Sequence, residues 1–401
     1  MSQVESYKKI LESIFKQKVN FTNYDIKNNC IGALSRQGEY NEFTNNFVER
    51  LKRINNYFSN SPNYIKEIIN TAKQIGQTSG YKWSGAYSEL VALDYWIQFK
   101  DLTNIKFPAR GSVKSFPNSI AKKVGKKEVD LDMSLDLSTI RIYTDVKSLI
   151  PTHMELTDQI LERLKDRTLR QDYLIGTDNL HDVDYLRTKS DFIHELRNGN
   201  LIDKLEESID QNKKSCDYTL RSGRNLSFKI SYAKAGKNTV LTTFREFDPY
   251  KLAIDYEYKI LDYYTKLLID EPSLITFVIN PWFNQELNIR KDDFLQTFFR
   301  SLSRRVFMNL TKDDRDMQLL FPELKGMNLR ISDVAKKISG IIFIKDNSIM
   351  KSESKINDTY IYLNPNATNK VLTISDFNIL NWSPEPEIQR PFIDDFYYDN
   401  Y

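Results

Sequence analysis

Apolar residues recur at intervals of three or four positions through the first part of the chain. Examples are Phe47, Leu51, Ile54 and Phe58. Because a helix completes a turn about every 3.6 residues, this spacing places them on one helical face. The pattern predicts a helical N-terminal segment over residues 1–80. A second helix, apolar on nearly all sides, is predicted over WSGAYSELVALDYWIQF, with Ser84 as its N-cap.

Residues 128–149, EVDLDMSLDLSTIRIYTDVKSL, alternate between apolar and polar side chains on both sides of a short polar turn. Successive side chains of a strand point to opposite faces, so this alternation predicts a β-hairpin. The second strand presents Ile142 and Val146 on one face. It presents Asp145 and Lys147 on the other face. Two charged side chains are unusual there, because the apolar face of the same strand is suited to burial.

The predicted turn of this hairpin covers residues 136–139, because aspartate is favoured at the first position of a β-turn. That turn sets a register in which Asp130 lies directly opposite Asp145. Two carboxylates about 4.5–5.5 Å apart between their Cβ atoms repel each other and destabilise a sheet. A divalent cation such as Mg²⁺, which prefers oxygen ligands, resolves the conflict. Lys147 would then lie beside the metal, where it could orient a water and counter charge on a phosphate.

The remaining pattern predicts further elements in chain order. Residues 151–249 read as an inserted block, with two polar helices over 155–214 and a second hairpin around Gly236. A long helix is predicted over Tyr250–Ile269. Three strands follow in SLITFVIN, SGIIFIKD and TYIYLNPN, the first apolar throughout and therefore expected to be buried on both faces. Residues 367–401 read as an acidic, aromatic C-terminal tail.

The composition argues against a strongly basic nucleic-acid-binding protein, a disulfide-rich protein, a zinc protein and a membrane protein. A formal net charge of +3 is too small for a general basic coat that binds nucleic acid. Cys30 and Cys216, together with three histidines, form neither a disulfide framework nor a zinc spacing, which favours the reducing cytoplasm. The N-terminus lacks the apolar core of a signal peptide, and no apolar run approaches the ~18 residues of a membrane span. We therefore expect a cytoplasmic protein without a membrane partner.

The order of an acid, a hairpin and Asp-x-Lys resembles the PD-(D/E)xK nuclease superfamily. The preceding helix is similar to the Gly-x3-Glu-x2-Ala helix of Holliday-junction resolvases and Mrr-type restriction enzymes, through Gly85, Glu89 and Ala92. The resemblance implies an α/β restriction-endonuclease-like fold, with a mixed central sheet flanked by helices. Its core would cover residues 81–150 and 250–366, separated by the inserted α+β subdomain and preceded by the added helical segment.

The resemblance also implies roles for individual residues. Glu89, Asp130 and Asp145 would be metal ligands, and these three together with Lys147 would form the catalytic set. One departure is Val129, which stands where the superfamily commonly has proline. Asp132 is the alternative to Asp130 as a ligand, because its spacing of 13 residues before Asp145 is typical of the superfamily. The predicted turn favours Asp130.

The implied activity is Mg²⁺-dependent hydrolysis of DNA phosphodiester bonds, with Mn²⁺ able to substitute, by an endonuclease that defends against foreign DNA. The alternatives are a repair or recombination nuclease, an RNA nuclease and a non-catalytic nucleic-acid-binding subunit of a larger complex. Nucleases of this fold often form homodimers to cut duplex DNA. Because the chain has no Gly-x4-Gly-Lys-Ser/Thr motif, energy-driven movement along DNA would need an ATPase or sensor partner.

Basic residues outside the catalytic set are candidates for phosphate contacts, with an ordinary solvated surface as the alternative. Five lie in the loop before the hairpin and two on a helix predicted over residues 292–310. They are Arg110, Lys122, Lys123, Lys126, Lys127, Arg300 and Arg304.

Overall fold

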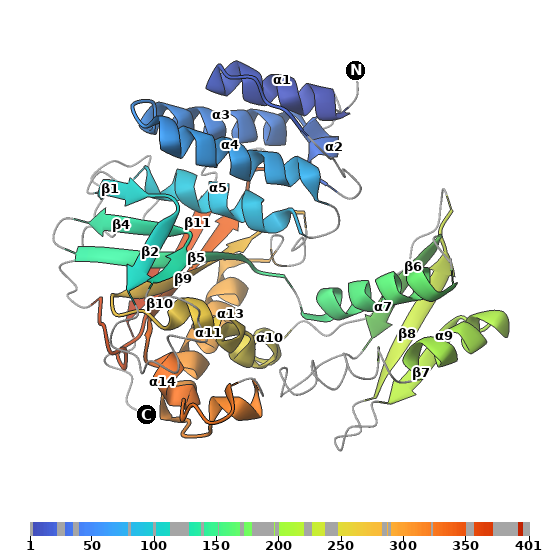
Figure 1. Ribbon diagram of the computed structural model, residues 1–401. Coiled ribbons are helices and arrows are strands. Elements are labelled where there is room, and N and C mark those ends of the chain that lie inside the picture. The colour runs from blue at the N-terminus through green and yellow to red at the C-terminus, as the bar shows by residue number, and fades with distance from the viewer. Residues whose placement is uncertain are drawn as a thin grey trace. The chain divides into compact units, whose positions relative to one another are not determined.

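The computed structural model divides the chain into two compact units (Figure 1). Unit 1 comprises Met1–Leu149, Tyr263–Asp316 and Gly326–Tyr401, and unit 2 comprises Ile150–Asp262 and Met317–Lys325. The residues that the structure describes are 3–21, 29–34, 40–78, 82–98, 102–112, 128–137, 140–150, 152–168, 172–178, 196, 200–219, 227–236, 248–282, 287, 290–321, 324–349, 357–371 and 392–395.

The N-terminal part of unit 1 is helical, as the apolar spacing predicts. Its helices are α1 (Gln3–Phe15), α2 (Ile31–Leu34), α3 (Asn41–Tyr57), α4 (Pro62–Gln77) and α5 (Ser84–Trp96). The apolar side chains of α3 are buried in the same hydrophobic core as Leu135 and Ile142 of the sheet. The helical segment is therefore packed into the core of unit 1.

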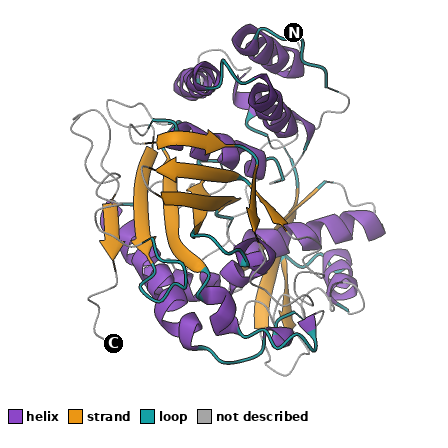
Figure 2. Ribbon diagram, turned by 60° about the vertical axis from the view of Figure 1, so that its left-hand side comes forward, coloured by secondary structure: helices purple, strands orange, loops and turns teal. Residues whose placement is uncertain are grey.

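A seven-stranded mixed sheet forms the centre of unit 1, with helices on both of its faces (Figures 1 and 2). Its order is β1-β4-β5-β9-β10-β11-β12. The strand β5 is antiparallel to β4 and parallel to β9, and β9 is parallel to β10. The expected mixed α/β architecture is confirmed. The strands are β1 (Leu102–Lys106), β4 (Met133–Leu137), β5 (Ile140–Ser148), β9 (Ser273–Ile279), β10 (Ile338–Asp346), β11 (Asn357–Leu363) and β12 (Phe392–Asp395).

The hairpin of β4 and β5 is present, but the predicted register is wrong by two residues. Leu137 pairs with Ile140 and Leu135 with Ile142, so the chain reverses between Leu137 and Ile140. Asp136 lies within β4 and forms an ion pair with Arg141 of β5, at 2.5 Å between Oδ1 and Nε. The cross-strand ion pair and the burial of Leu137 prevail over the turn preference of aspartate.

The first strand of the predicted hairpin is split in two. Its beginning, β3 (Glu128–Leu131), leaves the large sheet and pairs with β2 (Ala109–Ser112) in a separate two-stranded sheet. Asp132 lies at the break between β3 and β4. The ladder between β4 and β5 ends with Met133 opposite Thr144, so β5 continues past this point without β4 as a partner.

The second half of unit 1 contains the three predicted strands. All seven residues of β9 are buried, as expected for a strand covered on both faces. The helix α13 (Asp292–Arg304) packs on β10, where the rings of Phe299 and Phe343 stack with their centroids 4.1 Å apart. It continues into a π-helical turn (Arg305–Asn309) and a 3-10 turn (Leu310–Lys312), and α14 (Ile331–Ala335) follows.

The long helix predicted over Tyr250–Ile269 is interrupted. It consists of α10 (Pro249–Glu257) in unit 2, a 3-10 segment (Tyr258–Tyr263), and α11 (Tyr264–Leu267) in unit 1. The segment YEYKILDYYT contains four tyrosines, and aromatic side chains lose freedom in a helix and form it less readily than straight-chain residues.

Unit 2 is an α+β structure that overlaps the predicted insertion. Its elements are α7 (Thr152–Thr168), β6 (Tyr173–Asp178), α9 (Leu201–Asp210), β7 (Ser215–Thr219), β8 (Ser227–Lys234), α10 and a 3-10 turn (Met317–Leu319). The three strands form one antiparallel sheet in the order β6-β8-β7. One of them, β6, lies where only helices were predicted, and β7 begins just after that range. The other strand of the hairpin predicted around Gly236 falls outside the described residues.

One described segment of the predicted tail belongs to the large sheet. Residues Phe392–Asp395 form β12, which pairs in parallel with β11, so this segment is not a simple tail. The rest of the tail beyond residue 371 lies outside the described residues. Among the helices that the structure describes, none has the length and apolar character needed to cross a membrane.

Candidate active site

Asp145 is a buried carboxylate in the middle of the large sheet. It lies on β5 between β4 and β9 and is only 2% exposed. Neither of its carboxylate oxygens receives a hydrogen bond from a described residue. Its contact is an ion pair with Lys147, at 2.5 Å between Oδ2 and Nζ. Because burying a charge without hydrogen bonds is costly, an unsatisfied carboxylate at this depth calls for a function.

Asp132 lies next to Asp145 because the first strand of the hairpin breaks there. Its Oδ2 accepts a hydrogen bond of 2.6 Å from the main-chain N–H of Val146, which β4 leaves without a ladder partner. Burial, followed by the negative charge of Asp145, raises the pKa of Asp132 to about 6. The break in the strand thus brings two carboxylates to the same point of β5.

Glu89 comes from α5, the helix that packs against β5. Burial, followed by the negative charge of Asp132, raises the pKa of Glu89 to about 8. The charge of Asp145 acts in the same direction, and the charges of Lys147 and Lys266 act in the opposite one. Glu89, Asp132 and Asp145 therefore influence one another electrostatically, and we call these three residues the carboxylate cluster.

Lys147 is the ammonium group next to the carboxylate cluster. Burial acts to lower its pKa, but the neighbouring carboxylates, Asp145 foremost, raise it above its ordinary value. Its Nζ also lies 5.1 Å from the centre of the Tyr263 ring, a cation–π contact. Lys147 is therefore held as a cation in a fixed place beside Asp145.

Tyr263 and Lys266 are residues of this site that the sequence did not reveal. Lys266, on α11, donates a hydrogen bond to the main-chain oxygen of Asp130, close to the break at Asp132. Residues 150–262 of unit 2 separate both residues from β5 in the sequence, and no local sequence pattern indicates that they belong to the site. Only the parallel pairing of β5 and β9 brings α11 back to this part of the sheet.

Asp130, the preferred ligand in the sequence prediction, does not face Asp145. Its register partner is Arg110 of β2, and the two form an ion pair of 3.1 Å in which both side chains are at least half exposed. The shifted register, with Leu137 rather than Leu135 opposite Ile140, puts Asp132 in the place predicted for Asp130. Asp132, the alternative, joins the carboxylate cluster instead.

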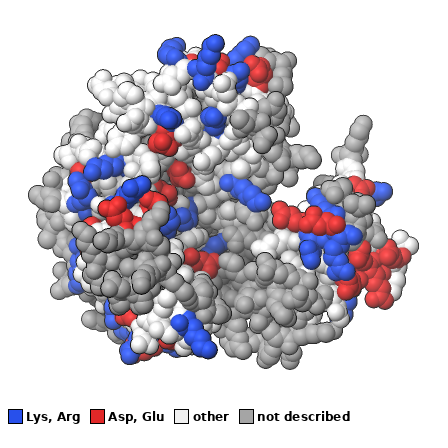
Figure 3. All heavy atoms as spheres, viewed as in Figure 1, with Lys and Arg blue, Asp and Glu red and all other residues white. Residues whose placement is uncertain are grey.

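Three of the seven basic residues predicted to contact phosphate lie in the described part of the chain. Arg110 is exposed on the small sheet, while Arg300 and Arg304 are half-buried on α13 and both have partners. The lysines at 122, 123, 126 and 127 lie outside the described residues. On the face shown in Figure 3, basic and acidic side chains are interspersed, without one continuous basic patch among the atoms drawn in colour.

The carboxylate cluster fits Mg²⁺ in the type of its donors. All are hard carboxylate oxygens, among them the two buried oxygens of Asp145. In this structure the ammonium of Lys147 forms an ion pair with Asp145 of the cluster. The described residues contain no group of three or more acidic, histidine or cysteine side chains close enough together to hold a metal ion.

No protein-family model, curated protein or solved structure matches the chain. Its chemistry is therefore inferred from its own residues.

Proposed function

We propose that the protein is a Mg²⁺-dependent nuclease that hydrolyses phosphodiester bonds in DNA. The observation that carries this proposal is the buried Asp145, unsatisfied by hydrogen bonds and paired with Lys147, next to Asp132 and Glu89. Three carboxylates around one ammonium leave an excess of negative charge, which a divalent cation would balance.

The order of elements supports a restriction-endonuclease-like fold. The helix α5 precedes the antiparallel strands β1, β4 and β5, and α11 precedes β9, which is parallel to β5. The resemblance implies a helix, a hairpin with a third strand, a helix and a further strand, and this order agrees with it. The small sheet of β2 and β3, the N-terminal helices and unit 2 are additions to that core.

In the proposed mechanism Glu89, Asp132 and Asp145 would hold the metal. When bound, Mg²⁺ would activate a water and stabilise the charge that develops on the phosphate. Lys147 has its ammonium fixed by Asp145 and Tyr263. It would orient the attacking water and add positive charge next to the phosphate oxygens. The closeness of Lys147 to the carboxylates keeps it protonated, so we assign it to electrostatic stabilisation and positioning.

DNA is the proposed substrate, and defence against foreign DNA the proposed setting, by an enzyme that forms homodimers to cut both strands. Repair or recombination, RNA cleavage and non-catalytic binding of nucleic acid are the competing functions. A substrate panel separates DNA cleavage from RNA cleavage and from non-catalytic binding: supercoiled plasmid, linear duplex, single-stranded DNA and RNA, each with Mg²⁺, Mn²⁺ or EDTA. We expect metal-dependent cleavage of DNA.

A matched pair of variants assigns that cleavage to the carboxylate cluster. Asp132→Asn should abolish cleavage, whereas Asp130→Asn, only two residues away and exposed, should retain it. Lys147→Ala should be inactive as well. Metal-independent cleavage, or Lys147→Ala cutting as well as the parent protein, would refute the proposed function.

A further inference from the structure

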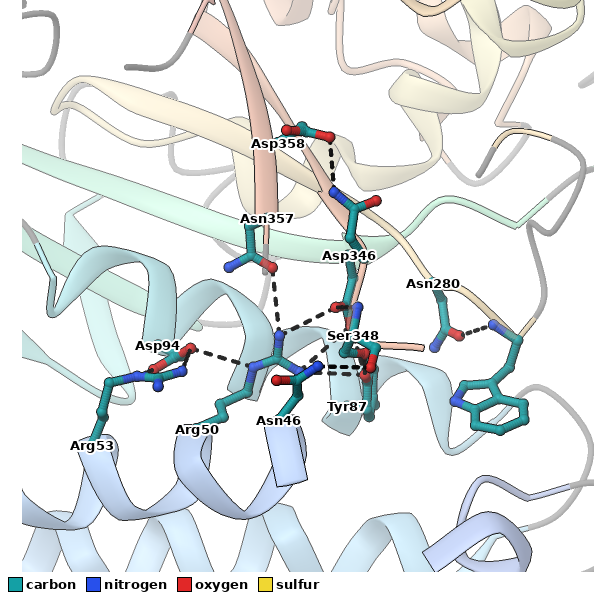
Figure 4. Close-up of polar contacts among 12 residues, drawn as sticks. Asn46, Arg50, Arg53, Tyr87, Asp94, Asn280, Asp346, Ser348, Asn357 and Asp358 are labelled. Carbon is teal, nitrogen blue, oxygen red and sulfur yellow. Dashed lines mark hydrogen bonds and ion pairs between the residues drawn. The ribbon is translucent and has the colours of Figure 1, made fainter. Parts of the chain in front are cut away.

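A second cluster of buried charged side chains lies between α3, α5 and the end of β10 (Figure 4). At its centre is Arg50 of α3, whose side chain is fully buried. Arg50 donates from Nη2 to Asp346 Oδ1 at 3.2 Å and from Nε to Asp94 Oδ2 at 3.4 Å. The guanidinium therefore joins two carboxylates that belong to different elements of unit 1.

The other members of this cluster complete its hydrogen bonds. Tyr87 of α5 donates its hydroxyl to Asp346 Oδ2 at 2.6 Å. Arg53 of α3 makes two hydrogen bonds to Asp94, at 2.8 and 2.7 Å. The main-chain N–H of Ser348 donates to Asp346 Oδ1 at 3.0 Å. With two arginines and two aspartates the formal charges balance, and we call these residues and Tyr87 the Arg50 network.

The Arg50 network holds α5 at two points of one face. Tyr87 and Asp94 are seven residues apart, about two helical turns, so their side chains lie on the same side of α5. Glu89 follows Tyr87 by two residues and lies about 200° around the helix axis from it. The helix is thus fixed on one side by the Arg50 network and presents Glu89 on the opposite side.

We propose that Arg50 is a positioning residue of the active site, which fixes the rotation and height of α5 and thereby places Glu89 beside Asp132 and Asp145. This inference rests on the proposed function, because it assigns Glu89 to metal binding. Outer groups that orient metal ligands commonly affect metal affinity 10- to 100-fold when they are replaced. The N-terminal helix α3 thereby becomes part of the active-site architecture.

The geometry of arginine is essential to this role. Its planar guanidinium presents several N–H donors in a rigid arrangement, so it can bond Asp94 through Nε and Asp346 through Nη2 at once. Lysine keeps the charge but carries a single ammonium on a flexible chain and cannot hold both carboxylates in this way. Arg50→Lys therefore keeps the charge balance of the network but removes the simultaneous contact with Asp94 and Asp346 that positions α5.

The test measures Mn²⁺ affinity and amide hydrogen exchange of α5 in the full-length protein and three variants. Arg50→Lys removes the two-point contact, and Tyr87→Phe removes only the hydroxyl that donates to Asp346. Phe299→Leu is the matched control, because it perturbs packing on α13 without contacting the Arg50 network. The milder Tyr87→Phe keeps the test valid if Arg50→Lys does not fold.

We expect Arg50→Lys to weaken Mn²⁺ binding about 10-fold or more and to accelerate exchange of the α5 amides. Tyr87→Phe should change Mn²⁺ affinity and α5 exchange in the same direction, but by less. Phe299→Leu should change neither quantity beyond what its effect on global stability accounts for. Positioning by Arg50 is overturned if the folded variants bind Mn²⁺ like the parent, or if α5 exchanges as it does in Phe299→Leu.

A parent protein that binds no Mn²⁺ would instead overturn the proposed function. In that case the exchange rates of α5 still decide whether Arg50 fixes the helix, since that readout needs no metal.

Discussion

Arg50 and Asp145 are both buried charged residues of unit 1, yet their surroundings differ. The Arg50 network balances two arginines against two aspartates, and directional hydrogen bonds connect its members. Asp145 receives no hydrogen bond from the described residues, and the carboxylate cluster carries more negative charge than Lys147 can balance. A satisfied buried network specifies a structure, whereas a buried group without hydrogen bonds calls for a separate explanation, for which we propose a catalytic role.

The helix α5 contributes residues to both clusters. On one side of the helix, Tyr87 and Asp94 form hydrogen bonds within the Arg50 network. On the other side lies Glu89, and its pKa is raised to about 8 by burial and by the charge of Asp132. In the proposed function the first side contributes to stability and the second to catalysis. Variants on the two sides should therefore differ in the property that they change.

The largest expected effect is on activity, from Asp145→Asn. Removing the central carboxylate should lower the rate of DNA cleavage by a factor on the order of 10³ or more, because metal binding and the position of Lys147 both depend on it. Its free energy of unfolding should fall little or even rise, since the variant buries no uncompensated carboxylate. Single-turnover cleavage rates and urea unfolding measure the two quantities; a variant that is destabilised but active would contradict the comparison.

The opposite behaviour is expected from Asp346→Asn in the Arg50 network. Breaking this buried ion pair leaves Arg50 with only Asp94, which it shares with Arg53, and should lower the free energy of unfolding by about 3–5 kcal/mol. Asp136→Asn is the control, because Asp136 and Arg141 form a partly exposed ion pair that should contribute about 0–1 kcal/mol. Urea unfolding of both variants at neutral pH checks this, and equal losses would show that burial of the network is unimportant.

A smaller effect should appear in the pH dependence of the metal-free protein. The pKa of Glu89 is raised to about 8 in the folded protein, from an ordinary value of 4.5. Between these values the folded state binds more protons than the unfolded state, so the stability contribution is complete below pH 4.5 and is lost as pH rises toward 8. The loss should amount to a few kcal/mol at most, on the order of one per pH unit.

Glu89→Gln isolates that contribution, because glutamine has no proton to lose. Urea unfolding in EDTA from pH 5 to 8 should show a flatter stability profile for the variant than for the parent protein. Parallel profiles would mean that Glu89 is solvated and already ionised at neutral pH.

The smallest expected effect comes from Lys266→Ala. Lys266 bonds the main-chain oxygen of Asp130 and influences Glu89 only through its charge, so its loss should alter Mn²⁺ affinity a few-fold at most. Its stability effect should stay within about 1 kcal/mol, typical of one partly exposed hydrogen bond. Titration of Mn²⁺ measures the first quantity, and a complete loss of binding would make Lys266 part of the cluster itself.

The sequence predicted those parts of the fold that depend on local periodicity. The helices before α5 and the buried strand β9 follow from apolar spacing alone, and so does the presence of the β4–β5 hairpin. The register does not, because the turn preference of Asp136 competes with its ion pair to Arg141 across the hairpin. The wrong register is the reason why the sequence prediction placed Asp130, and not Asp132, opposite Asp145.

The candidate site was predictable to the extent that its residues are close in sequence. Asp145, Lys147 and the alternative Asp132 all belong to one hairpin, and Glu89 lies on the helix before it. Tyr263 and Lys266 return from beyond unit 2 and leave no such signal. Arg50 did leave one, since a charged residue on the apolar face of α3, between Phe47 and Ile54, indicates a buried ion pair.

The most direct test of the central claim is calorimetric titration of Mg²⁺ into the parent protein and Asp145→Asn. If the carboxylate cluster is a metal site, the parent protein should bind Mg²⁺ saturably and release protons from Glu89 and Asp132, whose pKa values are raised. Asp145→Asn should lose that binding while remaining folded. Absence of saturable binding by the parent protein, or equal binding by Asp145→Asn, would contradict the claim.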